Sequence, residues 1–190
     1  MKFIIGIGNP EQQYEKTRHN VGFRALDVWC KNRSGVWRDK KKYRSRIASF
    51  DSFLLIKPET YVNNTGDAVS SIQRKYESAP ADFLFVCDDV NLIFGKIRLR
   101  EAGGAGGHHG LESVATALGT EDFPRLRIGV GSEAMSTGDL TDFVLQLFTA
   151  EEEKKIGGIL EKAAAVCESW VSSGFDGART CLSRLQSVQS

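Results

Sequence analysis

Three histidines, His19, His108 and His109, are the side chains of this sequence whose charge changes near neutral pH. A hydrolase working near pH 7 needs such a group to take a proton from water. His19 lies at the start of a helix predicted from Asn20 to about Lys31, where the helix dipole disfavours the imidazolium form. A neutral imidazole at this position can serve as a general base.

A base of this kind needs a carboxylate that fixes its tautomer and its orientation. Asp88 is the candidate, because it stands at the tip of the buried strand predicted at Phe83–Cys87. Each residue also has a structural interpretation. His19 could cap or pack a helix, and Asp88 could form a turn.

Other chemistries fit the sequence poorly. A structural zinc site needs four spaced ligands, and adjacent His108 and His109 without a Cys-x-x-Cys pair do not supply them. A serine nucleophile of the Gly-x-Ser-x-Gly type has no matching motif. Gly6-Ile7-Gly8 is similar to the start of a dinucleotide fingerprint, but Asn9-Pro10 breaks it. We therefore expect neither a metal nor a cofactor.

Short apolar strands alternate with helical segments along the chain. Strands are predicted at Lys2–Ile7, Ser52–Ile56, Phe83–Cys87 and Leu126–Val130, and helices at Asn20 to about Lys31, around Ala68–Ile72, at Leu111–Leu118, after a capping box at Thr149 and Glu152, and from Ala178 to Leu185. This alternation predicts a single α/β domain over residues 1–190, with a mixed, mostly parallel twisted sheet and helices on both faces.

Ligands of such sheets bind beyond the carboxyl ends of the strands. Polar or glycine-rich segments follow three of the predicted strand ends and occupy one further loop: Gly8-Asn9-Pro10, Cys87-Asp88-Asp89, Gly103–Gly107 and Tyr61–Asn64. The sequence therefore places its candidate site at this edge.

Composition excludes several classes of protein. The 25 Lys and Arg nearly balance the 24 Asp and Glu, so nucleic-acid affinity must come from local patches. The four cysteines are scattered, as in a reducing compartment. No apolar run approaches the ~20 residues of a membrane helix. We expect a cytoplasmic protein without a membrane segment, and a monomer.

Two basic features stand out. The segment Arg38–Arg46 holds six basic residues in nine, beside Trp37. It is either a solvated loop or edge strand guarded by lysines, or a phosphate-contacting patch. Arg100 and Arg127 lie near predicted strand ends and flank the glycine run. They could clamp one phosphate, or be ordinary surface charge.

Five motifs in register resemble those of bacterial peptidyl-tRNA hydrolases, from residue 3 to about 185. They are Gly6-Ile7-Gly8-Asn9-Pro10 with Tyr14 and Thr17–Gly22, Lys57–Gly66, Cys87–Val90, Gly104–Leu111, and Phe123–Gly131. Any one of these blocks is a weak signal, but five in order cover nearly the whole chain.

The resemblance implies hydrolysis of the ester that joins a peptide to the 3′-terminal ribose of tRNA, with peptidyl-tRNA as the partner. It makes His19 the general base, Asp88 its orienting carboxylate and Asn9 a substrate-positioning group. Asn63 would contact the substrate and help to hold the water or the oxyanion. By the same resemblance, Tyr14 and Tyr61 line the site, Arg100 and Arg127 bind a tRNA phosphate, and Gly138–Phe148 falls on a mobile lid.

The sequence departs from the family pattern at a few positions. His109 stands where the family usually has Asn, which contacts the peptide of the substrate, so the peptide grip is expected to differ and to vary with pH. Val62 replaces a usual Met. The alternative function is a non-enzymatic RNA-binding module of the same fold, which would not need the His19–Asp88 pair.

Overall fold

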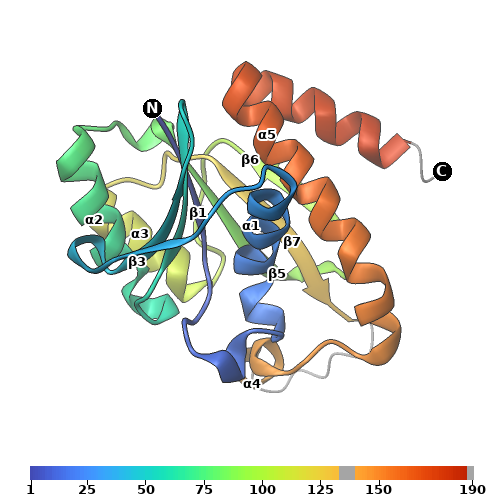
Figure 1. Cartoon of the computed structure of the whole chain (residues 1–190). Coiled ribbons are helices and arrows are strands. Elements are labelled where there is room, and N and C mark those ends of the chain that lie inside the picture. The colour runs from blue at the N-terminus through green and yellow to red at the C-terminus, as the bar shows by residue number, and fades with distance from the viewer. Residues whose placement is uncertain (133–139, 188–190) are drawn as a thin grey trace.

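The computed structural model describes residues 1–132 and 140–187, which form one seven-stranded sheet covered by helices (Figure 1). The strands lie in the order β2-β3-β4-β1-β5-β7-β6. Their bounds are β1 Lys2–Gly6, β2 Arg38–Lys40, β3 Ser45–Ser49, β4 Phe53–Pro58, β5 Phe83–Ile93, β6 Ile97–Arg100 and β7 Arg125–Gly131. The α-helices are α1 Val21–Asn32, α2 Thr65–Tyr76, α3 His109–Leu118, α4 Leu140–Leu145 and α5 Ala150–Ser187.

The parallel strands occupy the centre of the sheet. β1 pairs with β4 and β5, and β5 pairs with β7, all in parallel. The outer strands β2, β3 and β6 are antiparallel to their neighbours. The predicted α/β fold with a mixed sheet is confirmed, and its parallel part is the four central strands. The basic segment Arg38–Arg46 contains the edge strand β2 and the start of β3.

Alternating side chains of the central strands divide the core into two layers. Ile4 and Leu84 pack with apolar residues of α1 and α5 on one face. Phe3 and Phe85, one position along, pack with those of α2 and α3 on the other (Figure 1). Successive residues of a strand point to opposite faces, so strands apolar throughout require helices on both.

The capping box predicted before the long helix is present. The Glu152 backbone N–H donates to Thr149 Oγ1 at 3.2 Å, and the Thr149 N–H donates to Glu152 Oε2 at 2.7 Å. Gly174, with φ 69°, breaks α5 into two arms. These arms correspond to the two C-terminal helices that the sequence predicts.

The four cysteines are free thiols, three of them buried. Within the described ranges, no helix has both the length and the hydropathy needed to cross a membrane.

Strand β5 is longer than the sequence predicts, and this fixes Asp88. The sequence predicts that the strand ends at Cys87, but it continues to Ile93, because β7 runs beside it and pairs Ile128 with Asp88. The last β1 pair lies earlier, between Gly6 and Val86. The backbone of Asp88 is therefore paired with β7 on one side. On the other side, β1 has already ended, and the loop that follows β1 lies beside Asp88 instead of a paired strand.

Gly22 brings the start of α1 against the two central strands. A Cβ at this position would lie 2.2 Å from the Val86 carbonyl oxygen and 2.8 Å from that of Ile7. Both are backbone atoms of the core sheet and cannot move aside. The absence of a side chain thus sets the distance between the residues just before α1 and strand β5.

We expect Gly22→Ala to destabilise the fold by at least about 1–3 kcal/mol, the usual cost of forcing extra atoms into a packed core. Gly157→Ala is the matched control, because a Cβ at Gly157 in α5 meets nothing within 4 Å. The control should gain about 0.5–1 kcal/mol from its better helix propensity. Urea unfolding of both variants measures the difference, and equal stabilities would contradict the close-approach argument.

Candidate active site

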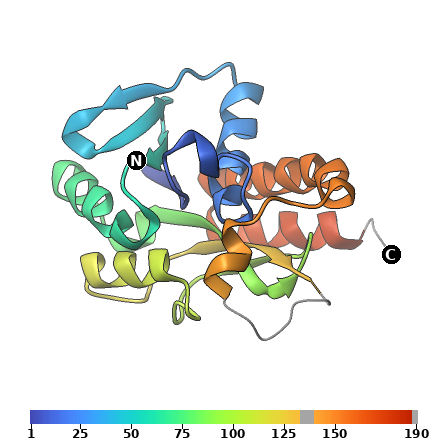
Figure 2. The ribbon, with the colours of Figure 1, turned by 90° about the horizontal axis from the view of Figure 1, so that it is seen from below.

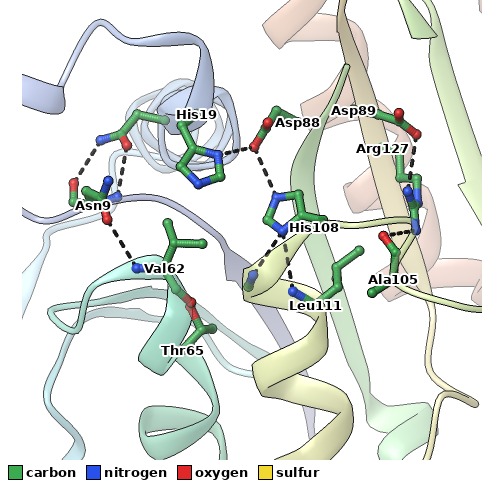
Figure 3. Close-up of polar contacts among 12 residues, drawn as sticks. Asn9, His19, Val62, Thr65, Asp88, Asp89, Ala105, His108, Leu111 and Arg127 are labelled. Carbon is green, nitrogen blue, oxygen red and sulfur yellow. Dashed lines mark hydrogen bonds and ion pairs between the residues drawn. The ribbon is translucent and has the colours of Figure 1, made fainter. Parts of the chain in front are cut away.

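Two imidazoles meet one buried carboxylate at the carboxyl edge of the sheet (Figure 3). His19 Nδ1 lies 2.7 Å from Asp88 Oδ1, and His108 Nε2 lies 3.1 Å from the same oxygen. Asp88 is only 2 % exposed. His19 sits in the short 3-10 helix η2 (Arg18–Asn20), which runs directly into α1. The predicted meeting of His19 and Asp88 is therefore present in the structure.

His108 caps helix α3 and thereby acquires a fixed tautomer. Its Nδ1 accepts from the backbone N–H groups of Gly110 at 3.1 Å and Leu111 at 3.4 Å (Figure 3). A nitrogen that accepts carries no proton, so the proton of the neutral ring is on Nε2 and is donated to Asp88. The first turn of α3 thus helps to hold the Asp88 carboxylate through an imidazole.

Asp88 in turn sets the tautomer and the proton affinity of His19. Because Asp88 accepts at Nδ1, the Nε2 atom of neutral His19 carries the lone pair, and it has no partner in the described part of the chain. Burial lowers the pKa of His19, but the charge and hydrogen bond of Asp88 raise it more, so that it lies above its usual 6.5. The carboxylate therefore outweighs the effect of burial, so the pKa of His19 is raised rather than lowered as its place at a helix start would favour.

The pKa of Asp88 moves the other way. Burial alone would raise it, but His108 and His19 together hold the pKa of Asp88 well below its usual range. The carboxylate is therefore charged at every pH at which His19 titrates, and it stabilises the imidazolium whenever one forms.

His19, Asp88 and His108 are also the group of side chains in residues 1–132 and 140–187 that could hold a metal ion, with ligand atoms within 4.8 Å of one another. The tautomer of His108 opposes this use. Its Nδ1 already accepts two backbone N–H groups, so a metal on Nε2 would require an imidazolate or the loss of the α3 cap. The geometry suits proton transfer better than metal binding.

Asn9 is anchored so that its amide N–H₂ is left for a ligand. Its Oδ1 accepts from the Val62 backbone N–H at 3.1 Å, and its backbone is clamped by the side chain of Asn20 at 2.9 and 2.8 Å (Figure 3). Val62 belongs to the short 3-10 helix η4 (Val62–Asn64), which Thr65 Oγ1 braces through the Val62 carbonyl. Asn9 Nδ2, a donor, has no partner among the residues described.

These groups line one cavity of about 420 Å³, which we call the central cavity. Its polar side holds His19, Asp88, His108, Asn9 and Asn63. Its apolar side is built mainly from Tyr61, Val62, Leu140, Val144 and Leu145. Leu140 and Leu145 are among the more exposed large apolar side chains of the molecule. The polar part of the lining can therefore do chemistry while the apolar part binds apolar groups.

Arg18 ties the turn that carries His19 to this apolar wall. Its guanidinium makes two hydrogen bonds with the Glu152 carboxylate, at 2.9 and 2.6 Å, and one to the Val130 carbonyl. It also lies over the rings of Phe143 in α4 and Phe148, at 4.6 and 5.0 Å from their centroids. A buried Arg whose two terminal nitrogens are both hydrogen-bonded fixes η2, α4 and the start of α5 relative to one another.

Two arginines of β7 hold the glycine loop. Arg125 is buried and bonds the carbonyls of Gly103, Gly104 and Glu121. Arg127 bonds Asp89 Oδ2 at 3.2 Å and the carbonyls of Gly104 and Ala105 (Figure 3). The loop leads directly to His108, so these contacts help to position it. Arg127 is thus engaged in the protein, which the phosphate-clamp prediction did not anticipate.

The other predicted residues are distributed around the site. Tyr61, Asn63 and His109 line the central cavity, and exposed His109 contacts Glu112 at 3.1 Å. Tyr14 and Arg100 do not line it; Tyr14 lies in η1 (Gln12–Tyr14), and exposed Arg100 ends β6. Of the segment predicted as a lid, residues 138 and 139 lie outside the described residues, and α4 follows them.

Sequence reasoning missed His108, Arg18, Asn20 and Arg125. The signal for His108 was its position just before the helix at Leu111, where a cap is expected. The buried arginines gave no local signal, because Arg is rarely buried unless it is paired.

The shared carboxylate makes a prediction about the titration of His19. NMR titration of the ring protons should give a His19 pKa above 6.5, and Asp88→Asn should bring it below 6.5, because burial then acts without the opposing charge. His109, which is exposed and does not contact Asp88, is the internal control and should be unaffected. An unchanged His19 pKa in Asp88→Asn would contradict the assigned contact.

Comparisons with known proteins agree along nearly the whole chain. The model of the peptidyl-tRNA hydrolase family matches residues 3–189. The peptidyl-tRNA hydrolase of Carboxydothermus hydrogenoformans is 40 % identical over 188 residues, covering 97 % of this chain and 99 % of its own. That of Chloroflexus aggregans is 40 % identical over 182 residues, covering 94 % and 96 %.

Solved structures agree as well. The crystal structure of peptidyl-tRNA hydrolase from Acinetobacter baumannii matches with a TM-score of 0.88 at 27 % identity, covering 96 % of this chain and 94 % of that one. Together with the family match over residues 3–189, this likeness shows that the chain belongs to the peptidyl-tRNA hydrolase family.

Proposed function

We propose that this protein hydrolyses the ester bond between a peptide and the 3′-terminal ribose of tRNA. The observation that carries the proposal is the His19–Asp88 contact of 2.7 Å at a cavity that also exposes the Asn9 amide. Relatives named peptidyl-tRNA hydrolase, similar over almost their whole length, support the same substrate.

The first step is the attack of water on the ester carbonyl carbon. His19 Nε2 takes a proton from the water as the new C–O bond forms, and the resulting imidazolium is stabilised by Asp88. The intermediate then expels the ribose 3′-oxygen, which receives the proton from His19. The products are the free peptide acid and the tRNA hydroxyl, and the base returns to its starting state.

Asn9 suits the negative charge that develops on the carbonyl oxygen. Its Oδ1 is occupied by Val62, so the group it offers to the cavity is the Nδ2 donor. A fixed donor at a developing oxyanion is worth roughly 10²–10³-fold in rate. Asn63, exposed on η4 at the same cavity, is the second candidate donor.

An ester is activated compared with an amide, so one base and one oriented water suffice without a covalent intermediate. The proposal includes independence from metal ions, which the tautomer of His108 supports.

The apolar wall of Tyr61, Val144 and Leu145 is suited to side chains of the peptide. We further propose that the enzyme acts as a monomer, because His19, Asp88 and Asn9 meet within a single chain and need no residue from a second copy.

Removing the base should abolish most of the rate while leaving RNA binding intact. With N-acetyl-aminoacyl-tRNA as substrate, His19→Ala should lower kcat by about 10²–10⁴-fold, the usual contribution of general-base catalysis. The affinity for deacylated tRNA should stay within twofold, and a chelator should not slow the wild-type protein. Full activity of His19→Ala would refute the mechanism, and a wild type that binds tRNA without hydrolysis would favour the RNA-binding alternative.

The two predicted clamp arginines should behave differently, because their surroundings differ. Arg100 is exposed, so Arg100→Ala should raise KM for full tRNA substrates and leave a short N-acetyl-aminoacyl ester of CCA unaffected. Arg127 holds the glycine loop, so Arg127→Ala should lower kcat on both substrates. Steady-state measurement of kcat and KM on the two substrates tests both expectations. Equal effects of Arg100→Ala on both would exclude its phosphate contact.

A further inference from the structure

The structure shows where the basic segment Arg38–Arg46 lies relative to the central cavity. Its residues form β2, the short 3-10 helix η3 (Lys41–Tyr43) and the start of β3. We call its six cationic residues the basic tip: Arg38, Lys40, Lys41, Lys42, Arg44 and Arg46. Lys40 pairs with Ser45 of β3, and Ser45 pairs with Pro58 at the carboxyl end of β4. The basic tip therefore lies at the same edge of the sheet as the central cavity.

Figure 2 looks onto this edge and shows the light-blue β2–β3 hairpin extending along one flank. Counting from β1, which leads to Asn9, the hairpin strands follow after β4 in the order β3, then β2. Neighbouring strands lie about 4.8 Å apart, so the basic tip is roughly 10–15 Å from the strand that delivers Asn9.

The basic tip concentrates charge that the rest of the chain lacks. Nine residues hold six of the 25 Lys and Arg but one of the 24 Asp and Glu, so the remainder of the chain is net acidic. Arg44 pairs with Asp67, and Arg46 with Asp39. The other four cations have no ion-pair partner anywhere in residues 1–132 and 140–187 and are exposed. Mutual repulsion makes such a cluster unfavourable unless an anion binds it.

Protection of an edge strand explains only part of this cluster. Lysines on β2 would suffice to block pairing with another sheet. Lys41 and Lys42 lie in η3, beyond the strand, and Arg44 adopts a left-handed conformation with φ 46° just after it. Their charges project from a turn that has no sheet edge to protect.

A second hollow connects the basic tip with the central cavity. This side cavity of about 350 Å³ is lined by Arg46 of the basic tip, by the Phe23 ring and by Lys57. It is also lined by Asn9, which lines the central cavity as well. The two hollows thus adjoin at Asn9. The side cavity is also lined by four carboxylates, Glu11, Glu15, Asp27 and Glu59, so it marks how near the basic tip lies to the central cavity and is not itself a phosphate site.

From this arrangement we propose that the basic tip binds the phosphate backbone of the tRNA part of the substrate. The inference rests on the proposed function for the identity of the RNA. A polyanion matches four unpaired cations, and backbone contacts of this kind strengthen binding without reading sequence. The tip lies on the opposite flank of the sheet from Arg100 in β6, so it is a contact additional to the predicted clamp.

The test compares two triple variants that remove the same charge. The tip variant is Lys40→Gln, Lys41→Gln and Lys42→Gln. The control variant is Lys31→Gln, Arg74→Gln and Lys75→Gln, three exposed cations in the last turns of α1 and α2, away from the carboxyl edge. Binding of deacylated tRNA is measured by fluorescence anisotropy at several KCl concentrations, which requires no hydrolysis.

The tip variant should bind tRNA about tenfold more weakly at low salt, and the slope of log affinity against log salt should flatten by roughly 2, as expected when two or three phosphate contacts are lost. The control variant should stay within twofold of the wild type. Equal losses in both variants, or an unchanged slope in the tip variant, would overturn the proposal.

Kinetics separate this proposal from the proposed function. The KM of the tip variant should rise for full N-acetyl-aminoacyl-tRNA more than for the corresponding ester of adenosine, which carries no phosphate for the tip to bind. A wild-type protein that hydrolyses neither substrate would refute the proposed function, while weaker tRNA binding by the tip variant alone would still support the basic tip. Equal rises in KM on both substrates would count against the tip.

Discussion

A single carboxylate oxygen organises this site. Asp88 Oδ1 accepts from His19 and from His108, which come from segments 69 and 20 residues away in the chain. An ionised carboxylate in the core is costly unless it is hydrogen-bonded. The two imidazoles meet this need, and one of them rests on the first turn of α3. The tautomer of the base, its orientation and its raised proton affinity all follow from this oxygen.

The surrounding structure keeps that oxygen and its partners in place. β5 runs past β1 beside β7 and carries Asp88 on a hydrogen-bonded ladder. Gly22 lets α1, and with it the turn of His19, approach the same strand. Arg125 and Arg127 hold the loop that ends in His108. Each of these contacts involves backbone atoms of the sheet or of the glycine loop. The site is therefore built on the core of the fold and not on a surface loop alone.

The fold and the core of the site could be predicted because their signals are local. Apolar runs mark the central strands, and Asn9 and Asp88 stand at the tips of two of them. The extension of β5 could not be predicted, because it depends on β7, some 40 residues later in the chain. His108 acquires its partner only when α3 is placed beside β5. Arg18 and Arg125 were not recognised because burial of an arginine depends on acceptors that are distant in sequence.

The contact between Arg18 and Glu152 joins residues 134 positions apart in the chain. Until the first turn of α5 is synthesised, Arg18 beside the base lacks its carboxylate, and an unpaired buried charge costs about 3–5 kcal/mol. During translation the nascent protein is itself a peptide esterified to tRNA. The chain therefore completes its own site only after residue 152 has been added, when most of its 190 residues, still esterified to tRNA, have already been made.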